Sequence, residues 1–232
     1  MKATREGSGG MFDAIAPRYD LMNRLISLGL DRSWRRALIA TQHGAARILD
    51  LATGTGDVAL ELVRRYPQAE VLGVDPSEGM LRLGRQKLTR ARQSRVRLVR
   101  GDACKLGLAE NAVGGATMAF GIRNVPDRPA ALAELRRVIQ PGGVLAILEL
   151  SEPEGLLGAP ARFHMHQVVP RLGTWLSGAQ EYAYLARSIA AFPPPAEFCG
   201  LCEAAGFEEV QARRLSFGVV HLYTARVPAE PQ

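Results

Sequence analysis

The sequence predicts one α/β domain with a mostly parallel β-sheet and helices on both faces of the sheet. Short apolar runs that suit strands alternate with stretches of helical spacing between residues 47 and 150, and such alternation builds βαβ units with parallel strands. A length of 232 residues is enough for one well-buried domain and short for two. The share of hydrophobic residues, 47%, excludes a disordered chain.

The first βα unit is the clearest. Two short helices, around 11–19 and 31–41, are expected before it. Its strand spans 47–52 and leads into a glycine-containing turn at 53–56. A helix is expected at 57–66, because apolar residues recur there at helical spacing.

A second unit starts with a strand at 70–75 and continues into a helix that Ser77 is placed to cap. The remaining elements follow in order: strands at 95–99, 113–120 and 143–150, a helix at 128–139, helices near 161–172, 181–191 and 193–205, and strands at 207–213 and 217–225. Ligands of such sheets bind beyond the carboxyl ends of the strands, so a site is expected in the loops at that edge.

The amino-acid composition limits the compartment and the kinds of partner that are expected for the protein. Residues 1–10 are polar and are expected to form a flexible tail rather than a signal peptide, with the domain at 11–226. No run approaches the roughly 18–20 apolar residues of a membrane-spanning helix. Three cysteines, an odd and small number, are typical of reduced thiols in the cytoplasm. The net charge of +6 suits an anionic partner, either nucleic acid or a membrane surface.

The stretch Asp50–Asp57 (DLATGTGD) is the most informative part of the sequence. Gly54 and Gly56 let the backbone approach a ligand closely, and the helix beyond them offers unpaired N–H groups. A dinucleotide fingerprint needs a third glycine, and Ala59 at that position is a permitted variant. The turn therefore predicts a nucleotide or nucleoside site and leaves a dehydrogenase open.

Two acidic residues follow later strands. Asp75 ends the second strand, where a carboxylate can accept hydrogen bonds from the ribose hydroxyls of an adenosine. A helix N-terminal acid favoured by the helix dipole is the alternative for Asp75. Asp102 follows the third strand and can meet the adenine amine; an ordinary turn aspartate is its alternative.

These motifs together resemble class I S-adenosylmethionine-dependent methyltransferases. The general match consists of the Asp50–Asp57 block, Asp75, Gly101-Asp102-Ala103 and the Arg137–Gly143 segment (RVIQPGG). A narrower match resembles the UbiE/MenG quinone C-methyltransferase family and covers about residues 11–225. It consists of FDAIAPRYDLMN at 12–23, FGIRNV at 120–125, VPRLG at 169–173, YAYLARSI at 182–189 and AGF at 205–207.

The resemblance implies a Rossmann-like fold with a seven-stranded, mostly parallel sheet and a C-terminal antiparallel strand. It implies a helical lid at 11–42, a helical substrate-side insertion at 152–195, S-adenosylmethionine as cofactor and a lipid quinol as substrate. Its cofactor positions are Asp50, Gly54, Thr55, Gly56, Asp75, Pro76, Met80, Asp102, Ala103 and Ala119. Ala119 departs from the serine or threonine that is frequent there, so a side-chain contact is lost.

Methylation of a quinol carbon needs stabilisation of the adjacent phenolate. Arg123 and Asn124 follow the fourth strand and are the expected catalytic residues, Arg123 as a phenolate stabiliser or as the holder of a proton-accepting water. The alternative for Arg123 is a clamp on loop carbonyls. Tyr19 is expected to act from the lid. His164 and Tyr182 are candidates for substrate binding.

Two other features of the sequence have more than one explanation. Cys199 and Cys202 lie in an amphipathic pattern without a second ligand pair, so a core helix and no metal site is expected. The segment 82–100 holds eight basic and no acidic residues. A solvated helix face explains it, and peripheral contact with the inner face of the membrane is the functional alternative. RNA binding is disfavoured because aromatic residues are absent from this run.

The predicted function is therefore conversion of demethylmenaquinol to menaquinol. The alternatives are a benzoquinol of the ubiquinone pathway, an RNA methyltransferase, and a cofactor-binding protein without catalysis.

Overall fold

The computed structural model describes Ala16, Asn23, Arg24 and residues 26–153 and 179–229. Its elements in chain order are α2 (Asp31–Ile39), β1 (Arg47–Leu51), α3 (Asp57–Arg65), β2 (Glu70–Asp75), α4 (Glu78–Arg90), β3 (Val96–Arg100), β4 (Val113–Ala119), η1 (Ile122–Asn124), α5 (Arg128–Val138), β5 (Ile139–Leu150), α8 (Ala179–Ala190), α9 (Pro195–Ala204), β6 (Glu208–Leu215), η4 (Ser216–Gly218) and β7 (Val220–Arg226). The helix expected near 161–172 lies outside the described residues, as does the helix expected near 11–19 except for Ala16.

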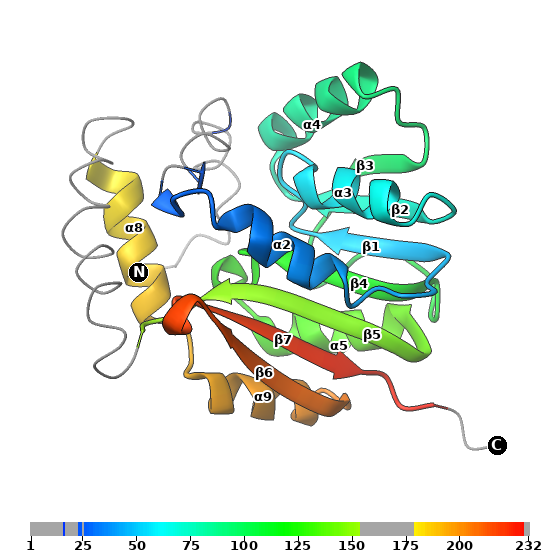
Figure 1. Cartoon of the computed structure of the whole chain (residues 1–232). Coiled ribbons are helices and arrows are strands. Elements are labelled where there is room, and N and C mark those ends of the chain that lie inside the picture. Colours follow the sequence, from blue (N-terminus) through cyan, green and yellow to red (C-terminus); the bar gives the residue numbers. More distant parts are fainter. Residues whose placement is uncertain (1–15, 17–22, 25, 154–178, 230–232) are drawn as a thin grey trace, which may run out of the picture.

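The seven strands form one sheet in the order β3-β2-β1-β4-β5-β7-β6 (Figure 1). The first five are parallel, and β7 runs antiparallel to both β5 and β6. The predicted fold class is confirmed, including the antiparallel C-terminal strand.

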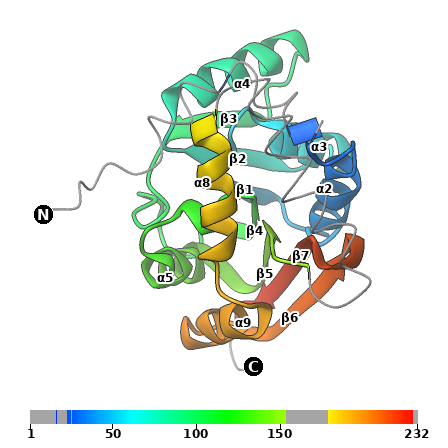
Figure 2. The ribbon, with the colours of Figure 1, turned by 90° about the vertical axis from the view of Figure 1, so that its left-hand side faces the viewer.

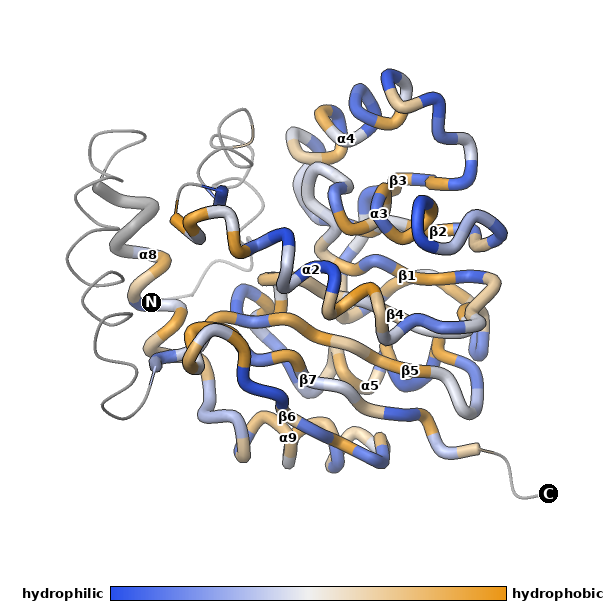
Figure 3. The backbone as a smooth tube through the Cα atoms, in the orientation of Figure 1, coloured by the Kyte–Doolittle hydropathy of each residue, from blue (hydrophilic) through white to orange (hydrophobic). Residues whose placement is uncertain are grey.

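Two apolar clusters pack on opposite faces of the sheet. One combines α2, α3 and α4 with the sheet through residues such as Trp34, Leu62 and Leu81. The other combines α5 and α9 with the sheet through residues such as Leu132 and Phe198. The central strands are hydrophobic along their length, whereas β6 at the sheet edge is hydrophilic (Figure 3), as expected of a strand that must not pair with another chain.

Local sequence signals place the helix starts. The Ser77 hydroxyl accepts the Met80 N–H at the start of α4, which confirms the expected cap. Asp127 caps α5 in the same way, by accepting the Ala130 N–H.

Two strands start more than one residue away from the expected position. Strand β5 begins at Ile139, which pairs with Val113, and the register then shifts so that Val144 pairs with Gly115. The Gln140–Gly143 turn is therefore a bulge within β5 rather than a turn before it. Strand β7 begins at Val220 because Ser216–Gly218 form a short 3₁₀ turn with left-handed φ at Ser216 and Phe217.

Helix α8 lies across the carboxyl ends of the strands. Figure 1 places it beyond the tips of β1 and β5, and Figure 2, seen from that side, shows it crossing in front of the sheet. Among the described helices, none has the length and hydrophobicity that a bilayer crossing requires. The carboxyl edge of the sheet, where a site is expected, is thus flanked by α8. Helix α2 covers one face of the sheet next to this edge.

Helix α4 approaches the glycine turn so closely that Gly84 cannot be enlarged without strain. A Cβ on Gly84 would lie 3.2 Å from the backbone carbonyl of Thr55 and 2.6 Å from Leu98 Cδ1. We expect Gly84→Ala to lower the free energy of unfolding by about 1–3 kcal/mol through overpacking, measured by urea denaturation. Gly200→Ala in α9 is the control, because its Cβ meets no atom within 4 Å. It should leave the protein equally or more stable; a Gly84→Ala protein of unchanged stability would contradict the close approach.

Candidate active site

The turn after β1 has an unusual backbone. Ala52, Gly54 and Gly56 all adopt left-handed φ angles, of 53°, 56° and 78°. Glycine tolerates this region without strain, and Gly56 serves as the N-cap of α3. The left-handed φ angles explain why glycine occupies positions 54 and 56 of the turn.

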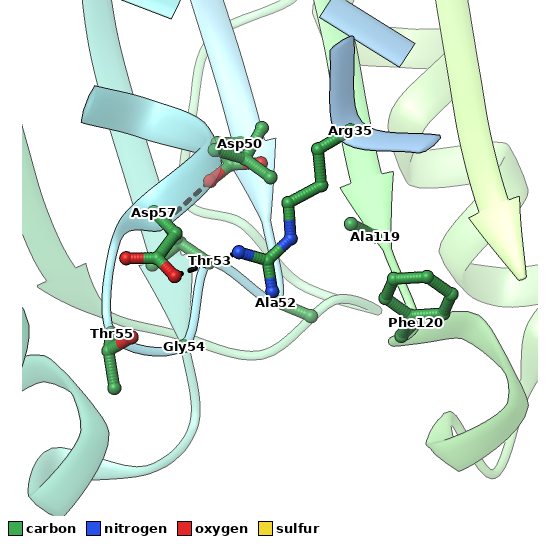
Figure 4. A pocket seen from close by; sticks show the side chains of 10 residues that line it. Arg35, Asp50, Ala52, Thr53, Gly54, Thr55, Asp57, Ala119 and Phe120 are labelled. Carbon is green, nitrogen blue, oxygen red and sulfur yellow. Dashed lines mark hydrogen bonds and ion pairs between the residues drawn. The ribbon is translucent and has the colours of Figure 1, made fainter. Parts of the chain in front are cut away.

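A pocket opens above this turn (Figure 4). Its lining residues come from α2, from β1 and its turn, from the start of α3 and from the end of β4: Arg35, Asp50, Ala52, Thr53, Gly54, Thr55, Asp57, Val58, Ala119 and Phe120. Asp50, Gly54, Thr55 and Ala119 are among the predicted cofactor positions. The pocket contains one guanidinium group and two carboxyl groups, so it can receive a ligand that carries charges of both signs.

Asp50 lies at the floor of this pocket and is 1% exposed. Its carboxyl oxygens accept hydrogen bonds from the Thr53 hydroxyl at 2.6 Å and the Thr117 hydroxyl at 2.9 Å. Burial raises the pKa of Asp50 from 3.8 to about 6, although the two hydroxyls and Arg35 oppose the rise. Nearby Asp75 raises the pKa further.

This pKa predicts a pH dependence of stability. The folded state binds a proton on Asp50 more tightly than the unfolded state, so stability is lost as pH rises from about 4 to about 6. The loss should be about 2–3 kcal/mol. The side-chain amide of the variant Asp50→Asn has no such proton to lose. The stability of the variant relative to wild type should therefore increase from pH 4 to pH 7. Urea denaturation at both pH values checks this, and an unchanged difference would contradict the raised pKa.

Asp57 links three elements around the turn. Its carboxylate accepts hydrogen bonds from Arg35 Nη1 of α2 at 2.8 Å and from Lys87 Nζ of α4 at 2.7 Å. Burial tends to raise the pKa of Asp57, but these two cations outweigh it and the pKa is lowered. Lys87 Nζ also donates to the Thr55 hydroxyl at 2.7 Å. This network joins α2 and α4 to the turn.

Asp75 holds the other side of the turn. One carboxylate oxygen accepts the Gly54 N–H at 2.8 Å and the other accepts the Ser77 N–H at 2.9 Å. Asp75 is 6% exposed. The carboxylate therefore fixes both the turn and the start of α4, and it lies directly beside the predicted cofactor position Gly54.

The other predicted cofactor positions lie directly after β2, within α4 and directly after β3. Pro76 is exposed, whereas Met80 is buried and packs inside. Asp102 is exposed and its side chain accepts the Cys104 N–H at 2.9 Å, which is the bonding of a turn aspartate. Ala103 is partly buried against the core.

Arg123 is paired with a buried carboxylate. Its Nη1 donates to Glu149 Oε1 at 2.7 Å and to the Phe120 carbonyl at 2.7 Å, and the Glu149 side chain is fully buried. The carbonyl clamp considered as the alternative for Arg123 is thus present. Within the described part of the chain, its buried Nε has no hydrogen-bond partner.

Asn124 connects this loop to α8. Its Oδ1 accepts the Tyr184 hydroxyl at 3.0 Å, and its Nδ2 donates to the Phe120 carbonyl at 3.5 Å. Arg123 and Asn124 therefore share the Phe120 carbonyl. Phe120 also lines the pocket, so the expected catalytic pair adjoins the expected cofactor site.

Several predicted residues cannot be placed. Tyr19 and His164 lie outside the described residues, and Tyr182 lies in α8 without a described side chain. Cys202 is buried in α9, as expected of a core helix. No cluster of metal-ligating side chains is found in the described part of the chain.

Sequence reasoning missed four residues of the site: Arg35, Lys87, Glu149 and Tyr184. Lys87 was counted only as part of the basic run. Arg35 lies on an amphipathic helix, and Glu149 is an acid inside an apolar strand. An acid at such a position signals a buried partner, and this signal could have drawn attention to Glu149.

Comparison with known proteins gives a consistent answer. Residues 1–226 match the model of the ubiE/COQ5 methyltransferase family. The chain is 48% identical to the ubiquinone/menaquinone biosynthesis C-methyltransferase UbiE of Syntrophotalea carbinolica, over 92% of this chain and 91% of that protein. It is 46% identical to the demethylmenaquinone methyltransferase of Deinococcus radiodurans, over 92% of this chain and 89% of that protein.

Solved structures support the fold. A SAM-dependent methyltransferase of Thermotoga maritima superposes with a TM-score of 0.67 at 23% identity, covering 94% of this chain and 99% of that one. A SAM-dependent methyltransferase of Aquifex aeolicus gives 0.66 at 19% identity, covering 93% and 98%.

Proposed function

This chain belongs to the ubiE/COQ5 methyltransferase family, and on that premise we propose that it methylates a ring carbon of demethylmenaquinol to give menaquinol. The similarity to the demethylmenaquinone methyltransferase of Deinococcus radiodurans supports a naphthoquinol as the substrate. A benzoquinol of the ubiquinone pathway is the second candidate, because the name of the Syntrophotalea carbinolica relative includes both quinones.

The residues around the glycine turn fit S-adenosylmethionine. The turn offers backbone without an intervening Cβ at Gly54, the pocket beside it contains charges of both signs, and Asp75 binds the Gly54 N–H. We propose the whole predicted set of cofactor positions as this binding site, with Asp75 as the ribose ligand. Bound there, the cofactor supplies an electrophilic methyl group on a sulfonium.

The chain's own residues would then align and activate the quinol. Alignment of the ring carbon with the methyl group is the main contribution expected of such an enzyme. Arg123 stays protonated and stabilises the phenolate that makes the ring carbon nucleophilic. Asn124 holds a quinol oxygen or the water that accepts the phenol proton. Tyr19, His164 and Tyr182 are proposed on the lid and substrate side.

A methyl-transfer assay tests this function. Purified protein with radiolabelled S-adenosylmethionine is offered reduced demethylmenaquinone, a reduced benzoquinone analogue or RNA. We expect label in the naphthoquinol. Preference for the benzoquinol would favour the second candidate function, methylation in the ubiquinone pathway. Label only in RNA would reject quinol methylation. Cofactor binding without any transfer would indicate a protein without catalysis.

A lipid substrate also favours a cytoplasmic protein that touches the membrane at its periphery. Seven arginines of the segment 82–100 are exposed, on α4, on the edge strand β3 and in the loop between them: Arg82, Arg85, Arg90, Arg92, Arg95, Arg97 and Arg100. Each basic residue near an anionic surface contributes about 1 kcal/mol of attraction. We propose this basic face as the membrane contact.

Charge reversal of the basic face is expected to weaken binding to anionic vesicles. Three substitutions, Arg90→Glu, Arg92→Glu and Arg97→Glu, should lower the partition coefficient about 100-fold or more, measured by co-sedimentation with phosphatidylglycerol vesicles. The control reverses three exposed arginines elsewhere: Arg36, Arg213 and Arg214. Equal loss in both proteins would assign the effect to net charge and remove the basic face as a specific contact.

A further inference from the structure

The pocket beside the glycine turn contains a cation that comes from outside the turn. Arg35 extends from α2 over the turn, and its guanidinium reaches into the pocket between Asp57 and Ala52 (Figure 4). The Arg35 side chain is 12% exposed. It is thus a mostly desolvated cation that faces a pocket, which is a position suited to an anionic group.

The charges in the pocket match one end of the proposed cofactor. An amino acid carries an ammonium and a carboxylate on the same carbon, and the methyl donor ends in such a group. Asp75, at the end of β2, accepts the Gly54 N–H and is not among the residues that line this pocket. With the adenosine beside Asp75, the amino-acid end of the cofactor falls over the turn, toward Arg35.

We propose that Arg35 is the carboxylate ligand for the amino-acid end of the methyl donor, which rests on the proposed function. A guanidinium presents parallel N–H donors that fit a carboxylate in bidentate fashion. The buried carboxyl group of Asp50 lies at the floor of the same pocket, where it supplies negative charge toward the ammonium.

The network around Asp57 allows Arg35 to make this contact. Asp57 accepts a hydrogen bond from Lys87 Nζ at 2.7 Å as well as from Arg35. Its charge therefore stays compensated when the guanidinium shares its donors with a ligand. Asp57 at 2.8 Å and Asp31 at 3.8 Å from Arg35 Nη1 hold the side chain in place. The fork is consequently oriented before the ligand arrives, which reduces the entropy lost on binding.

The test removes the guanidinium and the ligand carboxylate separately. Calorimetry measures the dissociation constants of wild type and Arg35→Gln for S-adenosylhomocysteine, for its decarboxylated analogue and for 5′-methylthioadenosine. We expect Arg35→Gln to weaken S-adenosylhomocysteine about 10- to 100-fold and the two ligands without a carboxylate less than about threefold. Arg36→Gln, an exposed neighbour on α2, should change none of them.

Other results overturn the assignment. Equal weakening of all three ligands by Arg35→Gln would reduce Arg35 to a structural bridge to Asp57, and unchanged affinities would remove it from the site. Both results leave the proposed function intact, whereas a wild-type protein that binds none of the three ligands rejects that function as well. Arg35→Lys covers the case in which the glutamine variant does not fold. It keeps the charge without the fork, and it should still bind S-adenosylhomocysteine more tightly than the decarboxylated analogue; loss of that preference would count against the proposal.

Discussion

We expect Glu149→Gln to lower the free energy of unfolding by about 3–5 kcal/mol, because it leaves the charge of Arg123 buried without its counter-ion. The Glu149 side chain is fully buried and the Arg123 side chain is 7% exposed. Glu149 also accepts the backbone N–H groups of Arg123 and Leu150, at 3.2 and 2.9 Å. Urea denaturation at neutral pH measures the loss.

A second ion pair in the same protein provides the control. Arg137 and Glu134 are also 2.7 Å apart, but their side chains are 32% and 13% exposed. Glu134→Gln should cost about 1 kcal/mol or less, as is usual for pairs near the surface. If the two substitutions had the same small effect, the Arg123–Glu149 pair would be no more important to stability than a surface contact.

A double variant separates the effect of the ion pair on stability from the effect of Arg123 on turnover. Replacing both partners by apolar residues of similar size, Arg123→Met with Glu149→Leu, removes both buried charges. It should cost clearly less than the sum of the single substitutions. Turnover should still be lost, since the guanidinium that we propose as the phenolate stabiliser is gone. This matters for catalysis, because Arg123→Ala alone would lower activity through destabilisation even if Arg123 never touched the substrate.

Much of the fold followed from local sequence patterns. Helix α3 buries Val58, Leu62 and Val63, the residues whose spacing predicted it. The bounds of β2 agree with the prediction at both ends, because a polar residue and a proline flank its apolar run. Periodicity and caps are local, so they can be read from neighbouring residues alone.

The missing parts of the site depend on contacts between distant residues. Arg35 meets Asp57 across 22 positions, Lys87 meets Asp57 across 30, and Arg123 meets Glu149 across 26. None of these partners follows from spacing, because the packing of α2 and α4 on the sheet decides them. The glycine turn could be recognised because its signal is a short run of neighbouring residues, whereas the charged pocket is assembled from four segments.

Asp75→Ala is expected to weaken binding of S-adenosylhomocysteine by at least about 100-fold. The proposed ribose contacts are two charge-assisted hydrogen bonds, each contributing about 1.5–3 kcal/mol. In addition, Asp75 holds the Gly54 and Ser77 N–H groups, so its loss also loosens the turn that we propose as part of the cofactor site. Calorimetry gives the affinity, and thermal denaturation without ligand gives the structural cost. Asp102→Ala, at an exposed turn aspartate, should cost less in both measurements.

A change in the ligand distinguishes the two roles of Asp75, contact with the ribose and support of the turn. A 2′-deoxyribose analogue of S-adenosylhomocysteine lacks one of the hydroxyls that Asp75 is proposed to bind. If the carboxylate binds that hydroxyl, wild type should prefer the complete ligand and Asp75→Ala should lose most of that preference. If Asp75 only supports the turn, the variant should weaken both ligands by the same factor. The bonds to Gly54 and Ser77 involve one carboxylate oxygen each, and a carboxylate oxygen can accept more than one hydrogen bond. The two roles are therefore compatible, and a preference that survives in the variant would leave Asp75 with the structural role alone.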